Sequence, residues 1–99
     1  MAEFTSSLKD AQDRPIPIIF RPWHEHTGGW FWWGTESCTP EEFTALWGFT
    51  LEYLRDAKQI HQFIWAYSPS HCGISSAQDY ETNRFPGYDQ MDLLGIDCY

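Results

Sequence analysis

The residues best suited to chemistry lie in one block, Arg21–Gly34. At its centre Glu25 stands between His24 and His26, with Arg21 four positions before it. A carboxylate flanked by imidazoles suits general acid/base catalysis and is a poor choice for simple packing. The block also holds four tryptophans, whose flat faces suit ligands that stack, chiefly sugars or bases. They are Trp23, Trp30, Trp32 and Trp33.

Two glycines follow the carboxylate closely. Gly28 and Gly29 free the backbone to turn sharply, and we expect this turn to bring Trp30 close to Glu25. The block therefore predicts acid/base work on a stacked ligand.

A metal site is one alternative for this block. On an extended chain His24 and His26 face the same way and could share a metal ion. The zinc-protease motif H-E-x-x-H fails, because Gly28 takes the place of its second histidine. We therefore expect no metal and no cofactor.

A purely structural role is the other alternative. In that interpretation Trp32 and Trp33 fill the end of the fold, and Glu25 forms an ion pair with Arg21. The pattern of residue types alone does not decide between these roles.

The elements that must position the block alternate between strand and helix. Short apolar runs bounded by turn residues predict strands, and apolar residues at steps of three and four predict helices. The expected order is helix 4–10, strand 16–22, helix 39–57, strand 62–67, helix 76–84 and strand 91–97. Such alternation is typical of parallel βαβ units, which place active sites at the carboxyl ends of their strands. Glu25 follows the first strand at that edge.

The long helix has a clear start signal. Thr39 is a good N-cap, Pro40 suits the first helical position, and Glu42 completes a capping box. The apolar stripe that we expect to pack on the sheet is Phe43, Leu46, Trp47, Thr50, Leu51 and Leu54.

Composition limits the function classes. The 99 residues amount to at most one domain, and 42% apolar residues suffice for a core. A net charge of −8 argues against a nucleic-acid partner. No run approaches the roughly 18 apolar residues of a membrane span, and no signal peptide is visible. The aromatic content of 18% and the negative charge favour a neutral stacking ligand. The odd number of cysteines, widely spaced at Cys38, Cys72 and Cys98, argues against a disulfide framework.

These segments closely resemble glycoside hydrolase family 26, whose main activity is endo-β-1,4-mannanase. The strongest match is Ile19–Gly34, which resembles the family's acid/base segment. Further matches follow in the same order along the chain. They are Cys38–Phe43, Leu46-Trp47, Ala66–Pro69 and Asp92–Tyr99.

The resemblance implies part of a (β/α)8 TIM barrel, about strands 4 to 6, with residues 1–99 forming a fragment of a single catalytic domain. It implies a retaining enzyme whose nucleophile, at the end of strand 7, lies outside this sequence. These 99 residues alone are then expected to be inactive and to need the rest of the barrel. The implied substrate is β-mannan or a related polysaccharide. A β-1,3-xylanase, a mixed-linkage glucanase and a non-catalytic sugar-binding remnant stay open as alternatives. The family is mostly secreted or attached to the cell envelope, which leaves the location of this chain open.

The resemblance also implies a role for each site residue. Glu25 would be the general acid/base and His24 would lie beside the cleaved bond. Trp30 would form a sugar platform, and Arg21 would support the carboxylates. The residue Tyr99 matches the tyrosine that hydrogen-bonds the nucleophile, and Asp97 belongs to the same cluster.

A retaining glycosidase needs one carboxyl group that is protonated at the working pH, about 5–5.5 Å from a second one. Apolar surroundings raise the pKa of a carboxyl group. Because Trp and Phe side chains surround Glu25 in the sequence, we expect its pKa to be raised.

Overall fold

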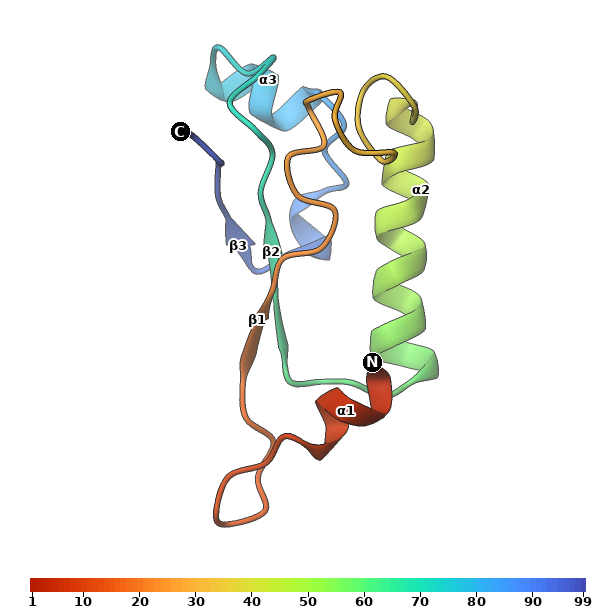
Figure 1. The fold of residues 1–99 in the computed structure, drawn as a ribbon, viewed down its shortest axis with the longest axis vertical. Coiled ribbons are helices and arrows are strands. Elements are labelled where there is room, and N and C mark those ends of the chain that lie inside the picture. Colours follow the sequence, from red (N-terminus) through yellow and green to blue (C-terminus); the bar gives the residue numbers. More distant parts are fainter.

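Three short parallel strands form the sheet of this protein, whose residues 1–99 are all described by a computed structural model (Figure 1). The central strand β2 (Phe63–Tyr67) lies between β1 (Ile18–Phe20) and β3 (Leu93–Leu94). In the register Ile18 stands opposite Phe63. Strands and helices alternate along the chain, so the predicted parallel α/β order is confirmed.

The helices lie at one side and at the two ends of this sheet. The longest, α2 (Pro40–Leu51), continues into a π-helical turn, Glu52–Ala57. Figure 1 shows α2 running alongside the strands, with α1 (Ala2–Ser7) near one end of the sheet and α3 (Ala77–Thr82) beyond the other. A 3-10 turn, Tyr88–Gln90, precedes β3. None of these helices combines the length and the apolar run that crossing a bilayer requires.

The start of α2 follows the sequence prediction. The Thr39 hydroxyl accepts the Glu42 N–H at 3.1 Å, and the Glu42 carboxylate accepts the Thr39 N–H at 2.9 Å. Pro40 occupies the first turn, where a missing N–H costs nothing. The capping box is therefore confirmed, and it fixes the residue at which α2 begins.

The end of this helix has the predicted extent but a different geometry. The Lys58 N–H donates to the Tyr53 carbonyl, five residues back, at 2.9 Å. Gln59 then takes a positive φ of 56°, and the Ile60 N–H donates to the Leu54 carbonyl at 2.9 Å. This wide turn reverses the chain into β2, a non-local requirement that the apolar spacing did not reveal.

The outer strands are shorter than predicted. The first was expected over 16–22, yet only Ile18–Phe20 pairs with β2. Pro17 and Pro22 have no N–H to donate, so they limit the ladder on both sides.

The third strand was expected over 91–97, and only Leu93–Leu94 belongs to the ladder. Further on, Asp97 donates its N–H to the Pro69 carbonyl at 2.8 Å and accepts the His71 N–H at 3.0 Å. Because Pro69 has no N–H, regular pairing breaks here while the two segments stay side by side.

The two short helices are displaced or shortened by turns at their ends. The first, expected over 4–10, ends earlier because the Asp10 carboxylate accepts the N–H groups of Gln12 and Arg14 in a tight turn. The other, expected over 76–84, ends at Thr82, because Asn83 is already extended and Arg84 takes a positive φ of 69°.

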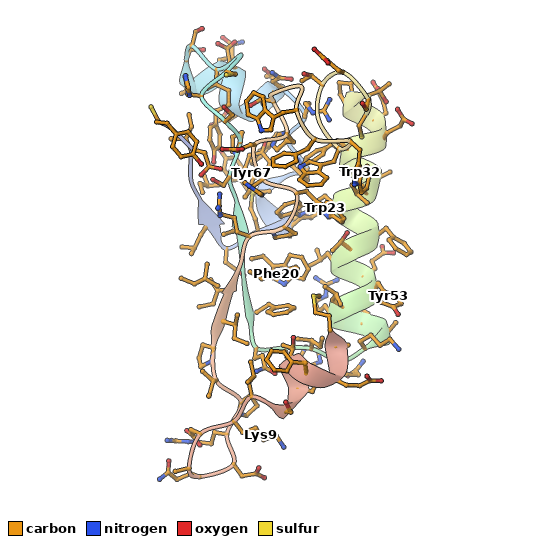
Figure 2. The ribbon with its side chains drawn as sticks, in the orientation of Figure 1. Lys9, Phe20, Trp23, Trp32, Tyr53 and Tyr67 are labelled. Atoms are coloured by element: carbon orange, nitrogen blue, oxygen red, sulfur yellow. The ribbon has the colours of Figure 1, made fainter.

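The core lies between the sheet and α2. Trp65 and Tyr67 lie two residues apart on β2, so their side chains point to the same face of the sheet, where both pack against Trp47 of α2. Phe20 of β1 stacks on Phe63 at 4.3 Å between ring centroids. Figure 2 shows Phe20 in the space between β1 and α2. The buried core residues are Cys38, Phe43, Trp47, Leu51, Leu54, Ile60, Trp65 and Tyr67.

The other face of the sheet is open. Ile19 in β1 is 64% exposed, and Leu93 in β3, on the same face by register, is 43% exposed. Both strands also carry unpaired backbone groups on their outer edges, since each pairs only with β2. Unpaired edges next to apolar side chains favour association with other chains.

We predict that the purified 99-residue chain self-associates through this open face. Light scattering after size exclusion should show species larger than a monomer, and the pair of changes Ile19→Lys and Leu93→Lys should shift the distribution toward the monomer. The matched control is Phe49→Lys, at a 65% exposed position on α2 away from the sheet. A monodisperse monomer for the unchanged chain would contradict the prediction.

Candidate active site

The site residues predicted from the sequence converge on one edge of the sheet. Arg21 follows β1 directly, and Glu25 lies four residues further on. Asp97 and Tyr99 come after β3, whose carboxyl end lies at the same edge because the strands are parallel. This edge is where α/β proteins commonly bind ligands.

Glu25 is held there by its backbone as well as its side chain. Its N–H donates to the Ser68 carbonyl at 2.9 Å, and its own carbonyl accepts the Gly28 N–H at 3.0 Å. Trp23 and Glu25 both have positive φ, 53° and 55°, a region that residues other than glycine rarely occupy. Such strain persists only where surrounding contacts fix it, and it concentrates at functional sites.

Glu25 as a residue is only 7% exposed, and hydrogen-bond donors lie close to its carboxylate. The Trp30 indole N–H donates to Oε2 at 2.9 Å, and the Tyr99 hydroxyl lies close to the carboxylate. Both groups stabilise the charged form and lower the pKa of Glu25, Trp30 the more strongly, and His24 and Arg21 add weaker favourable charge. Burial opposes them without reversing the sign. The expectation of a raised pKa is therefore wrong for these residues, because hydrogen-bond donors outweigh the apolar rings.

Arg21 pairs with Asp97 rather than with Glu25. Its Nη1 lies 2.8 and 2.7 Å from the two carboxylate oxygens of Asp97. The Ser68 hydroxyl donates to the same carboxylate at 3.1 Å. The structural alternative of a Glu25–Arg21 ion pair is therefore wrong, and Arg21 instead joins the end of β1 to the segment after β3.

The turn after Glu25 depends on Gly28. A Cβ at this position would lie 2.1 Å from the Trp30 ring, so any side chain would displace the indole. The predicted turn is confirmed, and its function in the fold is to return Trp30 onto the Glu25 carboxylate. Trp30 keeps 55% of its surface exposed, which leaves a ring face open beside the carboxylate.

The other tryptophans of the block divide between packing and exposure. Trp33 donates its indole N–H to the His24 carbonyl at 2.9 Å, and Trp23 donates to the Thr50 hydroxyl of α2 at 3.0 Å. Trp32 is 60% exposed and meets Trp23 edge to face at 5.3 Å. Figure 2 shows Trp23 and Trp32 together on the α2 side of the molecule.

The two histidines beside Glu25 lie in different surroundings. The His24 ring packs against Phe31 at 5.2 Å, whereas His26 stacks on Phe43 of α2 at 4.0 Å. The left-handed backbone at Glu25 breaks the extended geometry that would have turned both rings to one side. No group of three or more histidine, cysteine, aspartate or glutamate side chains is placed to hold a metal ion.

His26 belongs to the core. It is 1% exposed, neither ring nitrogen has a hydrogen-bond partner, and burial with the nearby Arg84 charge lowers its pKa to about 3. The hydroxyl of Tyr67 beside it is also unpaired, and burial raises the pKa of that phenol. His26 is therefore a neutral ring across a wide pH range.

Sequence reasoning missed Arg84, which is 3% exposed. Its guanidinium donates to the carbonyls of Cys38, at 2.6 Å, and Trp33, at 2.9 Å, and lies 5.0 Å above the Phe43 ring. It thus ties the tryptophan-rich loop to the start of α2. No local pattern marks this arginine, because both acceptors are backbone groups far away in the sequence.

The whole chain is similar to proteins of one known family. A sequence model described as glycosyl hydrolase family 26 matches residues 1–99. A mannan endo-1,4-beta-mannosidase of Bifidobacterium adolescentis is 43% identical over 84 residues, which are 85% of this chain and 8% of that protein. A second enzyme of the same name, from Bacillus subtilis, is 29% identical over all of this chain and 28% of its own length.

Solved structures agree with the fold. A modular endo-beta-1,4-mannanase from Cellulomonas fimi superposes with a TM-score of 0.91 at 41% identity, over 99% of this chain and 22% of that one. The family 26 beta-mannanase of Bacteroides ovatus gives 0.87 at 44% identity, over 97% of this chain and 27% of that one. The chain thus has the fold of part of a (β/α)8 barrel, and it spans less than a third of each of these relatives.

The lowered pKa of Glu25 leads to a prediction. The change Trp30→Phe keeps an aromatic ring but removes the N–H that stabilises the carboxylate, so the pKa of Glu25 should rise. Titration of the side-chain carboxyl carbon by NMR measures it. Trp32→Phe is the control, since that indole makes no hydrogen bond to Glu25, and an equal rise in both variants would contradict the assignment.

The buried His26 predicts how stability depends on pH. Its pKa is about 3 in the folded state and near the ordinary 6.5 when unfolded, so between these values only the unfolded chain takes up the proton. The free energy of unfolding should therefore fall as pH decreases from about 6.5 toward 3. In urea titrations His26→Phe should weaken this fall, whereas the exposed-site control His61→Gln should retain it. An unchanged pH dependence in His26→Phe would place the effect elsewhere.

Proposed function

This chain belongs to glycosyl hydrolase family 26, and we propose that it forms the acid/base-bearing part of the single catalytic domain of an endo-β-1,4-mannanase. The observation that carries the proposal is the Glu25 carboxylate, fixed at the carboxyl edge of the sheet with the Trp30 N–H on one oxygen. The mannan-degrading activity named for its relatives supplies the substrate class.

Each neighbour of Glu25 then has a defined task. The open face of Trp30 stacks on the sugar next to the cleaved bond, and the N–H at its edge fixes that face relative to the carboxylate. The backbone of His24 is fixed by Trp33, so its imidazole has a set place beside the same bond. The Arg21–Asp97 ion pair holds together the strand ends that present Glu25 and Tyr99.

The lowered pKa of Glu25 constrains the mechanism. In double displacement the group first protonates the leaving oxygen and later deprotonates water. The donors Trp30 and Tyr99 favour the carboxylate, which is the form required in the second step. The protonated form required in the first step needs an opposing influence.

We assign that influence to the nucleophilic carboxylate, which in this proposal lies elsewhere in the catalytic domain. A second negative charge about 5–5.5 Å away raises the pKa of a carboxyl group. Once the nucleophile has bonded to the sugar its charge is gone, and the pKa of Glu25 falls to the low value set by Trp30 and Tyr99. Glu25 thus donates a proton in the first step and accepts one in the second.

The test uses a chimera in which residues 1–99 replace the matched segment of the Cellulomonas fimi mannanase. With Glu25→Ala, a dinitrophenyl β-mannoside should still form the glycosyl-enzyme, because its leaving group needs no proton. A burst followed by slow turnover is expected. Added azide should restore turnover and give β-mannosyl azide, while hydrolysis of mannan stays orders of magnitude slower.

The matched control is Glu36→Ala, an exposed glutamate on the same loop, which should behave like the unchanged chimera. Loss of both substrates in Glu25→Ala, without a burst or azide product, would make Glu25 the nucleophile or a structural residue. A folded but inactive chimera would favour a non-catalytic sugar-binding role. Faster cleavage of β-1,3-xylan or mixed-linkage glucan than of mannan would reassign the substrate.

A further inference from the structure

Ser68 makes two contacts that no other residue of the site combines. It directly follows β2 and is 5% exposed. Its carbonyl accepts the Glu25 N–H at 2.9 Å, and its hydroxyl donates to Asp97 Oδ1 at 3.1 Å. One residue therefore contacts both the backbone of the acid/base and the carboxylate that pairs with Arg21.

The contact with Glu25 matters because of the backbone there. With a φ of 55°, Glu25 occupies a conformation that costs on the order of 1–3 kcal/mol unless its surroundings hold it. The Ser68 carbonyl is a fixed acceptor for that residue, so a displacement of Ser68 displaces Glu25 as well.

The contact with Asp97 fixes Ser68 in turn. The Asp97 carboxylate already takes both bonds from Arg21, and its N–H is held by the Pro69 carbonyl at 2.8 Å. Asp97 is thus a well-anchored acceptor. The Ser68 hydroxyl ties the end of the central strand to it, two residues before Tyr99.

We propose that Ser68 is a positioning residue, whose hydroxyl sets the placement of Glu25 relative to Asp97 and Tyr99. This inference rests on the proposed acid/base role of Glu25. Without the hydroxyl, the side-chain hydrogen bond from Ser68 to Asp97, which joins the end of β2 to the segment after β3, is lost. The Tyr99 hydroxyl is then held less closely beside Glu25 and stabilises the carboxylate less, which favours its protonation.

The chain offers a closely matched control in Ser70. It is two residues further along the same segment and is similarly buried, at 3% exposure. Its hydroxyl accepts the Cys72 N–H at 3.3 Å in a local turn and does not bond to Asp97. Ser68→Ala and Ser70→Ala therefore remove the same group from similar surroundings, and they differ in the link to Asp97.

The experiment compares both variants in the chimera. Ser68→Ala should lower kcat on mannan about tenfold with little change in KM, and should move the basic limb of the kcat/KM profile to higher pH. Ser70→Ala should leave kcat and the pH profile unchanged. NMR titration should show a raised pKa for Glu25 in Ser68→Ala only.

Equal effects of the two alanine changes on kcat, pH profile and Glu25 titration would overturn the inference. Ser68→Thr, which keeps a hydroxyl, should retain the Glu25 pKa of the unchanged chimera, and a value raised above it would also count against the inference. An inactive unchanged chimera would instead refute the proposed function. In that case the NMR titration still decides whether Ser68 positions Glu25, since it needs no turnover.

Discussion

The site depends on the backbone of Ser68 and Pro69, the segment that continues β2 beyond the sheet. Its backbone carbonyls accept hydrogen bonds from both neighbouring segments, although regular strand pairing has already ended. Ser68 accepts from Glu25 on one side, and Pro69 accepts from Asp97 on the other. Because a central strand has a neighbour on each side, one stretch of backbone can fix both groups of site residues. Backbone hydrogen bonds therefore hold both Glu25 and Asp97 to the end of the central strand, and the Ser68 hydroxyl adds a side-chain link to Asp97.

Arg84 gives the opposite side of the loop a comparable constraint. A buried guanidinium is costly unless its donors are satisfied. Here Nη1 and Nη2 donate to two backbone carbonyls and the guanidinium lies over the face of Phe43, while Nε has no hydrogen-bond partner. These acceptors leave it without a carboxylate partner, so its charge acts on neighbouring groups, including His26. The loop that carries Trp30 is thus anchored at Trp33 by a charged donor. Ordering the loop before a ligand binds lowers the entropy that binding must overcome.

Local signals in the sequence predicted the elements well. The capping box of Thr39 and Glu42 and the glycine turn at Gly28 both act over a few residues, so their types suffice to define them. Both outer strands are shorter than predicted, and the expectations for the site that failed concern distant groups. The pKa of Glu25 depends on Trp30 and on Tyr99 at the other end of the chain, and Arg21 pairs with Asp97 rather than with Glu25 as the structural alternative required. The sequence shows that aromatic residues stand near Glu25. Only the structure shows that the indole N–H of Trp30 donates to the Glu25 carboxylate.

Closing the barrel with further strands would change both the low pKa of Glu25 and the exposure of the open sheet face. The donors on Glu25 all come from these residues, whereas the proposed mechanism needs a second negative charge close to it. β1 and β3 meanwhile expose backbone edges and apolar side chains such as Ile19. In a closed barrel, further strands pair with those edges, and their carboxyl ends face the same rim as Glu25. Closure would therefore cover the apolar face and bring the second carboxylate of the proposed mechanism to Glu25 in a single structural change, so that stability and the proposed proton transfer depend on the same strands.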